Sequence, residues 1–271
     1  MAFIQNFSFP SKYLATEPQV SIILPSRKLA NDPNKQIWEI DRKFKTLYLL
    51  HGAGDNQTHW SRFTNVEWFA EKYNIAIVMP EGNMSFYSDM VHGQKYWSYL
   101  SNELPKYMQA VFPLSEKRED NFVAGVSMGG YGAYKLALSC PENFFAAASL
   151  SGALNIVEML LKEHVLLSDK FRDSNKNAFG EERLVKGTPN DLFYLLKYDI
   201  DNKKPLPHLY QNVGTEDFLY EYNQDFRRYA QTLGVPLSYE ESQGVHDWDY
   251  WQEQLPRVFD WLGKIMQNKS F

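Results

Sequence analysis

The sequence is poor in cysteine and has no long apolar run. Its 271 residues include a single cysteine, Cys140, so no intramolecular disulfide bond can form. We interpret this thiol as a passive buried side chain, because it precedes a proline at an expected helix end. No apolar run approaches the roughly 18 residues that indicate a membrane-spanning helix. The sequence therefore predicts a globular fold without disulfides and without a membrane partner.

Clusters of basic residues are also missing. The chain has 28 Lys and Arg against 33 Asp and Glu, a formal net charge of -5, whereas a nucleic-acid interface needs gathered positive charge. The first residues lack the basic and apolar regions of a secretory signal, so we expect a cytoplasmic protein. No spacing typical of metal ligands or of a phosphate-binding loop is present, and we expect no metal and no cofactor.

Five continuous apolar runs alternate with helix-like segments. Continuous rather than alternating hydrophobicity is typical of parallel strands covered on both faces, and the alternation predicts an α/β fold with a mostly parallel central sheet. Two N-terminal segments, 2–9 and 19–25, lack crossover helices and are expected to be antiparallel edge strands. Pro256 is expected to bend or restart the last helix. The apolar runs lie at 44–52, 74–82, 121–125, 146–152 and 207–217.

One region departs from this alternation. Residues from about 153 to 205 are polar and rich in helix-forming residues, without a convincing strand. We interpret them as a helical, cap-like insertion over the active site rather than as a second domain. The chain is therefore expected to form a single domain over residues 1–271.

A glycine-rich turn follows the third apolar run. Residues 121–125 read as a strand, the residues from Met128 read as a helix, and Ser127 lies between them in Gly-Val-Ser-Met-Gly. In an α/β sheet this pattern forms a tight strand-turn-helix that projects the serine hydroxyl from the carboxyl edge of the sheet. Gly125 and Gly129 are needed because a Cβ at either position would crowd the turn. We interpret Ser127 as a nucleophile, with a merely structural turn as the alternative.

A serine nucleophile needs a histidine base, which follows it along the chain in this kind of fold. Three of the six histidines follow Ser127. His164 lies in the irregular region and His208 begins an expected strand, where solvated or packed roles are typical. His246 lies in a glycine-containing loop just before the last helix. We interpret His246 as the base, with a surface histidine as the alternative.

The base needs a carboxylate that orients it. Asp217 directly follows an expected strand and lies between the serine and the histidine in chain order. Glu216 is its rival, and Asp225 lies further along, in the next helix. We interpret Asp217 as this acid, with a solvated helix cap as the alternative.

An oxyanion hole needs two N–H donors. One is expected from Met128, the residue after the nucleophile. The other is expected from the loop His-Gly-Ala-Gly-Asp after the first core strand, from Ala53 or alternatively from Gly54, where glycine permits close approach. His51 in this loop is interpreted as structural.

Aromatic residues are expected to shape the substrate pocket. Several lie in or beside loops at the carboxyl ends of the expected strands, where ligands bind in such sheets. Each by itself is more typical of packing, and the group together predicts a small, partly apolar mouth. The predicted substrate-binding residues are Trp60, Tyr87, Tyr96, Trp97 and Trp248.

Seven motifs resemble those of the esterase D-like α/β-hydrolases, and most closely those of bacterial tributyrin esterases. This family is related to S-formylglutathione hydrolases and to feruloyl and acetylxylan carbohydrate esterases. The likeness implies an α/β-hydrolase fold with Ser127, Asp217 and His246 as the catalytic triad and with Ala53 and Met128 as oxyanion donors. The motifs are YLLHGAGDNQTHW, TNVEWFA, ELPKYM, GVSMGGYGAYKLAL, SLSGAL, GTEDFLYE and HDWDYW.

The resemblance implies a serine carboxylesterase that hydrolyses short-chain acyl esters through an acyl-enzyme. The alternatives are an S-formylglutathione hydrolase, a feruloyl or acetyl esterase of small carbohydrate esters, and an acyltransferase of the same fold. The His-Gly loop has no cysteine and Val126 precedes the serine, which favours the tributyrin-esterase branch. The expected partner is a small-molecule ester, and the relatives suggest a homo-oligomer, either a dimer or a tetramer.

Overall fold

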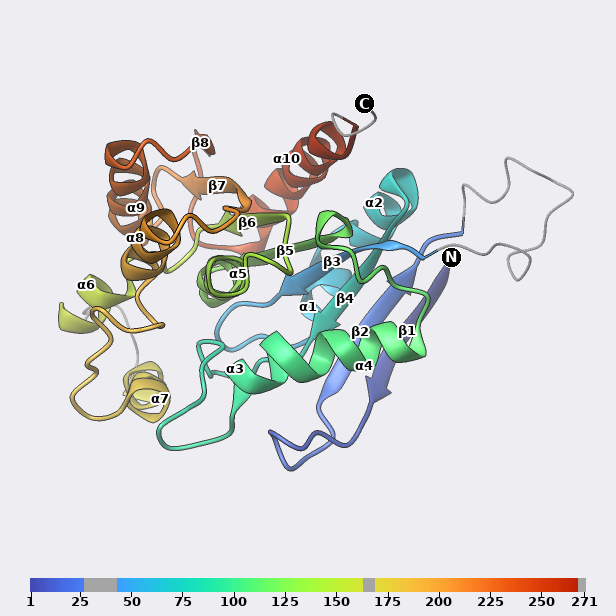
Figure 1. Cartoon of the computed structure of the whole chain (residues 1–271), viewed down its shortest axis with the longest axis horizontal. Helices are drawn as coiled ribbons and strands as arrows, with labels where there is room; N and C mark the ends of the chain where they lie inside the picture. The colour runs from blue at the N-terminus through green and yellow to red at the C-terminus, as the bar shows by residue number, and fades with distance from the viewer. Residues whose placement is uncertain (27–42, 163–168, 268–271) are drawn as a thin grey trace, which may run out of the picture.

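The computed structural model describes residues 1–26, 43–162 and 169–267. Within these residues one eight-stranded sheet runs through the molecule in the order β1-β2-β4-β3-β5-β6-β7-β8 (Figure 1). All five apolar runs predicted to be strands form strands, β3 to β7. The strands are β1 Ala2–Ser8, β2 Gln19–Leu24, β3 Lys45–Leu50, β4 Ile75–Pro80, β5 Asn121–Val126, β6 Ala146–Leu150, β7 His208–Gly214 and β8 Leu237–Ser242.

The sheet is mostly parallel. Six neighbouring strands pair in parallel, in the order β4-β3-β5-β6-β7-β8. In contrast, β2 is antiparallel to both β1 and β4. The antiparallel pairing predicted for the N-terminal segments is confirmed. The prediction that both are edge strands is wrong for β2, because it is hydrogen-bonded on both sides and its four central residues are buried.

Helices cover both faces of the sheet, and successive strand residues point into two separate cores. On β3, Leu47 and Leu49 belong to one core and Tyr48 and Leu50 to the other, as the period of two along a strand requires. One face is covered by α1 His59–Phe63, α2 Val66–Tyr73 and α10 Trp248–Gln267. The other is covered by α3 Tyr96–Ser98, a π-helical segment Tyr99–Glu103, α4 Leu104–Val111, α5 Met128–Ser139 and α9 Tyr220–Thr232.

The last helix contains a proline without being interrupted. The sequence predicts a bend or a restart at Pro256, but α10 is a single helix of 20 residues that includes it. None of the described helices combines the length and the apolar composition needed to cross a membrane.

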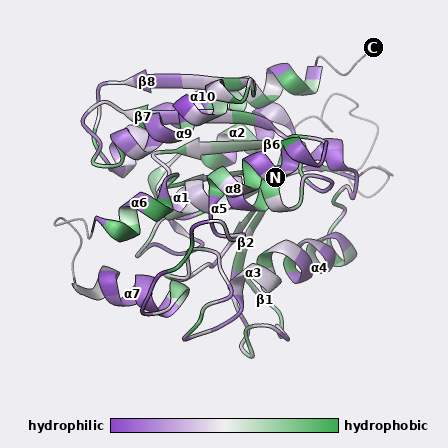
Figure 2. Cartoon of the chain, turned by 60° about the vertical axis from the view of Figure 1, so that its left-hand side comes forward, coloured by the Kyte–Doolittle hydropathy of each residue, from purple (hydrophilic) through white to green (hydrophobic). Residues whose placement is uncertain are grey.

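The region predicted to be an insertion holds three helices: α6 Ile156–Leu161, α7 Asp169–Phe179 and α8 Leu192–Asp201. They lie on one side of the molecule, with α6 and α8 next to α9 and α7 further away (Figure 1). α7 is largely hydrophilic (Figure 2). α8 packs on α5 and α9 as part of the helical layer. His164 lies outside the described residues. Three buried leucines anchor α8 in the core: Leu192, Leu195 and Leu196.

Candidate active site

The chain turns sharply between β5 and α5, and Ser127 lies at the turn. Its backbone angles, φ 55° and ψ -118°, are unfavourable for a residue that has a side chain. A Cβ at Gly125 would lie 2.3 Å from the carbonyl oxygen of Gly129, and a Cβ at Gly129 would lie 2.3 Å from that of Leu50. The turn therefore needs both glycines, as predicted.

Three side chains from three loops meet at the carboxyl edge of the sheet. Ser127 Oγ lies 2.9 Å from His246 Nε2, and His246 Nδ1 lies 2.9 and 3.0 Å from the two carboxylate oxygens of Asp217. The Asp217 side chain is fully buried and accepts a further hydrogen bond from the N–H of Leu219 at 2.7 Å. With Nδ1–H donated to the carboxylate, Nε2 accepts the hydrogen bond from the serine hydroxyl.

The rivals of Asp217 and His246 lie in other environments. Glu216 is exposed and accepts a hydrogen bond from Gln243 at 3.2 Å. Asp225 is paired with Arg228 at 2.6 Å. His208 is an exposed residue at the start of β7, at the opposite end of that strand from Asp217. The structure brings none of these rivals to Ser127.

Two aromatic rings pack against the His246 imidazole. The ring centroid of Trp251 lies 4.9 Å away at an interplanar angle of 87°, and that of Phe218 lies 4.4 Å away at 52°. The Trp251 indole is itself fixed by a hydrogen bond to Ser151 Oγ at 3.0 Å. Because both neighbours are packed, the imidazole is held in one orientation toward Ser127.

A cavity of about 210 Å³ lies beside Ser127. Ala53 and Met128 both line it, and neither backbone N–H donates a hydrogen bond to another described residue. Met128 begins α5, so the positive end of this helix dipole faces the cavity. The other lining residues are Phe86, Ala153, Met159, Phe218, Leu219 and His246.

The chain matches the family model named Esterase, described as "Putative esterase", over residues 11–262. It belongs to this esterase family. The sequence is also 32% identical over 269 residues to an acetyl esterase of Caldicellulosiruptor saccharolyticus. This match covers 97% of this chain and 98% of the relative. The chain is thus a carboxylic ester hydrolase.

Solved structures of similar sequence share the fold of this esterase. FphF of Staphylococcus aureus, a fluorophosphonate-binding serine hydrolase, has a TM-score of 0.86 at 33% identity, covering 97% of this chain and 98% of that chain. The S-formylglutathione hydrolase FrmB of the same organism has a TM-score of 0.83 at 33% identity, with the same coverage. The esterase therefore has the α/β-hydrolase fold of serine hydrolases.

None of the five aromatic residues predicted to contact the substrate is among the residues lining the cavity of this esterase. Trp60 and Tyr87 are fully buried. The Trp60 indole donates to the carbonyl oxygen of Leu50 at 3.0 Å, and the Tyr87 hydroxyl donates to that of His51 at 2.7 Å. Both side chains therefore hold the end of β3 and the loop that follows it.

The other three aromatics also pack against protein. Tyr96 is buried and donates to the side chain of Gln94 at 3.1 Å. The Trp97 ring lies 4.9 Å from the ammonium group of Lys135. Trp248 packs against other aromatic rings, including Trp60 at a centroid distance of 5.1 Å. Tyr96 is buried and Trp97 and Trp248 are half-buried, and residue type and loop position do not reveal these packing contacts.

The residues that do line the apolar part of the cavity were missed at the sequence level. Phe218 and Leu219 directly follow Asp217, so adjacency to the acid was an available signal. Met159 comes from α6, within the predicted insertion. Phe86 has a positive φ of 49°, and no sequence signal marks this turn.

His51 is structural, in agreement with its sequence interpretation. Its Nδ1 lies 2.7 Å from the carbonyl oxygen of Gly52, and its Nε2 accepts the N–H of Gly82 at 2.8 Å. Burial lowers the pKa of His51 to about 4, so the imidazole is neutral at neutral pH. It joins the loop that follows β3 to the loop that follows β4.

A second histidine–aspartate pair lies in the same loop and was also missed. His59 Nε2 lies 3.2 Å from Asp55 Oδ1. His59 Nδ1 is engaged by Asn56, whose backbone nitrogen lies at 3.1 Å and whose Oδ1 lies at 3.2 Å. Neither ring nitrogen of His59 is left for a serine.

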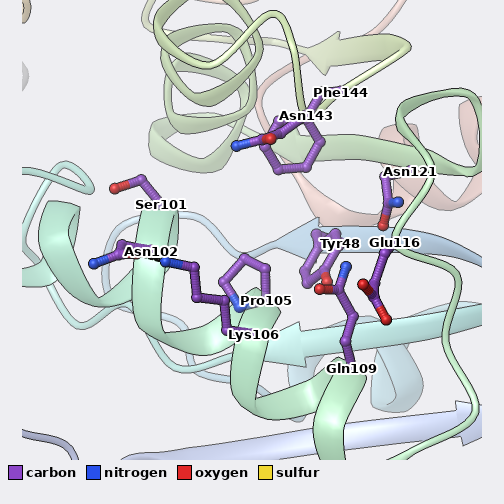
Figure 3. A pocket seen from close by; sticks show the side chains of 10 residues that line it. All are labelled: Tyr48, Ser101, Asn102, Pro105, Lys106, Gln109, Glu116, Asn121, Asn143 and Phe144. Atoms are coloured by element: carbon purple, nitrogen blue, oxygen red, sulfur yellow. Dashed lines mark hydrogen bonds between the residues drawn. The ribbon is translucent and has the colours of Figure 1, made fainter.

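A different pocket, of about 120 Å³, lies at the amino ends of the strands (Figure 3). Side chains of α4 and the preceding π-helical turn face Tyr48, Asn121 and Phe144 across it. Its serine, Ser101, donates to the carbonyl oxygen of Trp97 at 2.8 Å, and none of its lining residues is a histidine. This pocket has no activated nucleophile.

Proposed function

We propose that this esterase hydrolyses short-chain acyl esters, with Ser127 as nucleophile, His246 as general base and Asp217 as the acid that orients the base. The observation that carries the proposal is the hydrogen-bonded series from Ser127 Oγ through His246 to Asp217, with a contact of 2.9 Å on each side of the imidazole. A serine hydroxyl is a weak nucleophile, and a base in this position activates it.

The reaction has two acyl-transfer steps. Ser127 Oγ attacks the ester carbonyl carbon while its proton moves to His246 Nε2, and the N–H groups of Ala53 and Met128 stabilise the oxyanion. His246 then gives this proton to the alcohol oxygen as the bond from carbonyl carbon to that oxygen breaks. A water molecule then attacks the carbonyl carbon of the acyl-serine while its proton moves to His246 Nε2. As the bond from this carbon to Ser127 Oγ breaks, His246 returns the proton to Oγ and the carboxylic acid leaves.

The size of the cavity supports a short acyl group. Its volume of about 210 Å³ is below the roughly 300–1,000 Å³ of ordinary small-molecule pockets. Phe86, Met159 and Phe218 give it apolar walls. The name of the acetyl esterase relative agrees with a small acyl group.

A p-nitrophenyl ester series from acetate to octanoate tests the proposal. We expect the highest kcat/KM between acetate and butyrate, and loss of activity in Ser127→Ala. Ser101→Ala, which removes the serine of the other pocket, is the matched control and is expected to keep full activity. Activity retained in Ser127→Ala, or a preference for octanoate, would contradict the proposal.

The second candidate is hydrolysis of S-formylglutathione. It is favoured by the similarity to the S. aureus enzyme of that name at 33% identity. The same triad would attack a thioester carbonyl, and glutathione would leave in place of an alcohol. A kcat/KM for S-formylglutathione well above that for p-nitrophenyl acetate would select this function, and equal or lower values would leave the carboxylesterase.

A further inference from the structure

Lys135 is a buried charged residue that the two acyl-transfer steps do not use. It lies on α5, the helix that begins directly after Ser127, and it is only 2% exposed. Burial lowers the pKa of Lys135 to about 7, and the charge of nearby Asp89 opposes this only in part. Because a lowered pKa means that folding disfavours the charged form of a lysine, stabilisation by its charge does not explain a lysine at this position.

The Lys135 ammonium group joins two loops to α5. Its Nζ donates to the carbonyl oxygen of Tyr87 at 3.1 Å and to Ser88 Oγ at 2.8 Å, both in the loop that follows β4. Its third hydrogen bond, at 2.6 Å, goes to Asn190 Oδ1 in the segment before α8. A lysine ammonium group has three N–H donors, and three uncharged oxygens accept from it here. The end of the side chain is therefore fixed between the helix and both loops.

The turn that Lys135 binds carries Phe86, which lines the cavity beside the nucleophile. Phe86 and Tyr87 both have a φ of 49°, which is unfavourable for residues with a side chain and persists where the surrounding structure holds it. Ser88 Oγ, which accepts from Lys135, lies 3.0 Å from the carbonyl oxygen of Phe86 and donates to it. Lys135 is therefore linked to this turn directly at Tyr87 and through Ser88 at Phe86.

The same face of α5 also contacts Phe86 through a second side chain. The Tyr131 ring lies edge-on to the Phe86 ring, at a centroid distance of 6.1 Å and an angle of 69°. The Tyr131 hydroxyl donates to the carbonyl oxygen of Asn190 at 2.8 Å. Tyr131 and Lys135 are four residues apart, so they lie on one face of the helix. Because α5 begins directly after Ser127, this face fixes where Phe86 lies relative to the nucleophile.

We propose that Lys135 is a positioning residue for acyl-chain selectivity, which holds Phe86 as the wall that limits the length of the acyl group on Ser127. Its ammonium group acts through the protein, because its hydrogen bonds are made to the two loops and Lys135 is not among the residues that line the cavity. This inference rests on the proposed function and extends it to the choice of acyl chain.

Lys135→Met tests the inference because it nearly keeps the length of the side chain and removes all three donors. The turn at Phe86 then loses its attachment to α5, and the wall is free to move away from the cavity. One methylene group in an apolar pocket is worth about 10- to 200-fold in discrimination. We therefore expect the ratio of kcat/KM for p-nitrophenyl octanoate to that for the butyrate to rise about tenfold. For the acetate, kcat/KM is expected to stay within about threefold of the parent value, because the triad is untouched.

Phe86→Ala provides the readout that a merely structural role of Lys135 would not move. It removes the wall itself and is expected to raise the octanoate-to-butyrate ratio at least as much as Lys135→Met does. Adding Lys135→Met to Phe86→Ala is expected to leave the ratio unchanged, because no wall remains for the lysine to hold. Ser88→Ala removes one link between Lys135 and Phe86 and is expected to raise the ratio about threefold. This milder variant tests the inference even where Lys135→Met does not fold.

Tyr134→Phe is the matched control. Tyr134 is the neighbour of Lys135 on α5 and is fully buried, and its hydroxyl donates to the carbonyl oxygen of Tyr210 in β7 at 3.0 Å. The variant therefore also loses a buried hydrogen bond from α5, but one that leads to β7 and not to Phe86. We expect a lower melting temperature by circular dichroism and an unchanged octanoate-to-butyrate ratio.

The outcomes separate this inference from the proposed function. A ratio within about twofold of the parent in Lys135→Met and in Ser88→Ala overturns the positioning role, and so does an equal shift in Tyr134→Phe. A shift that is undiminished in the Phe86→Ala background overturns the action through Phe86. If Ser127→Ala keeps its activity in the same assay, the proposed function itself fails.

Discussion

Two histidine–aspartate pairs lie close together in this esterase, and they differ in what their histidines can still bind. In the pair of His246 and Asp217, one ring nitrogen contacts the carboxylate and the other lies 2.9 Å from Ser127 Oγ. In the pair of His59 and Asp55, both ring nitrogens are engaged by neighbouring residues. A histidine that is paired with a carboxylate is therefore not in a position to act as a base for a serine unless its other ring nitrogen also faces the hydroxyl.

A third histidine supports the same distinction. His51 has no carboxylate partner among the described residues, and its two nitrogens contact Gly52 and Gly82. It fixes the backbone next to Ala53, the proposed oxyanion donor. All three histidines lie near the catalytic loops, and substitution of each one is expected to give a different kind of effect.

The largest effect is expected from His246→Ala. Without the base, the serine hydroxyl keeps its proton and kcat for p-nitrophenyl acetate is expected to fall by roughly 10⁶-fold, as in other serine triads. Circular dichroism before the assay checks that the variant is folded. A loss of less than about tenfold would show that another group takes the serine proton.

The second effect is that of Asp217→Asn, expected to lower kcat by roughly 10⁴-fold. The amide cannot hold the tautomer of His246 whose Nε2 accepts from Ser127. Glu216→Gln is the matched control, because the neighbouring carboxylate is exposed and makes no contact with the imidazole. Equal losses in the two variants would exclude Asp217 as the specific partner of the base.

The third effect is on stability and concerns His51. Because its pKa is lowered from 6.5 to about 4 in the folded state, the unfolded chain binds a proton between these pH values that the folded chain does not. The free energy of unfolding is therefore expected to fall as pH falls through this window, by up to about 1.4 kcal/mol per pH unit.

Urea unfolding at several pH values measures this dependence. His51→Gln removes the titrating group and is expected to flatten the slope between pH 6.5 and 4, whereas His92→Gln, at an exposed position, is expected to leave it unchanged. An identical slope in the parent and in His51→Gln would refute this contribution.

The smallest effect is expected from His59→Gln. The glutamine amide can still donate to Asp55, and partly exposed pairs contribute about 0.2–1 kcal/mol. We expect kcat/KM to fall no more than about fivefold, measured in the same ester assay. A loss as large as that of His246→Ala would mean that the two pairs do not differ as described.

Much of the triad could be predicted from the sequence because each member is tied to a strand end. Ser127 follows β5 within a glycine turn, Asp217 follows β7, and His246 lies between β8 and the last helix. The carboxyl ends of parallel strands share one edge of a sheet. Sequence order and periodicity were therefore enough to propose their meeting point.

The pocket could not be predicted in the same way. Phe86 and Tyr87 are neighbours with the same unusual φ of 49°, yet Phe86 lines the cavity and Tyr87 contacts His51 instead. Which of two adjacent aromatics lines the cavity depends on a backbone turn that composition does not reveal.

The most direct test of the triad is covalent labelling with a fluorophosphonate, followed by peptide mapping. The phosphonyl group is expected on Ser127 alone in the parent protein, with no labelling of Ser127→Ala and a much slower reaction of His246→Ala. His59→Gln is expected to be labelled at nearly the parental rate. A label on another serine, or labelling that does not depend on His246, would contradict the assignment of nucleophile and base.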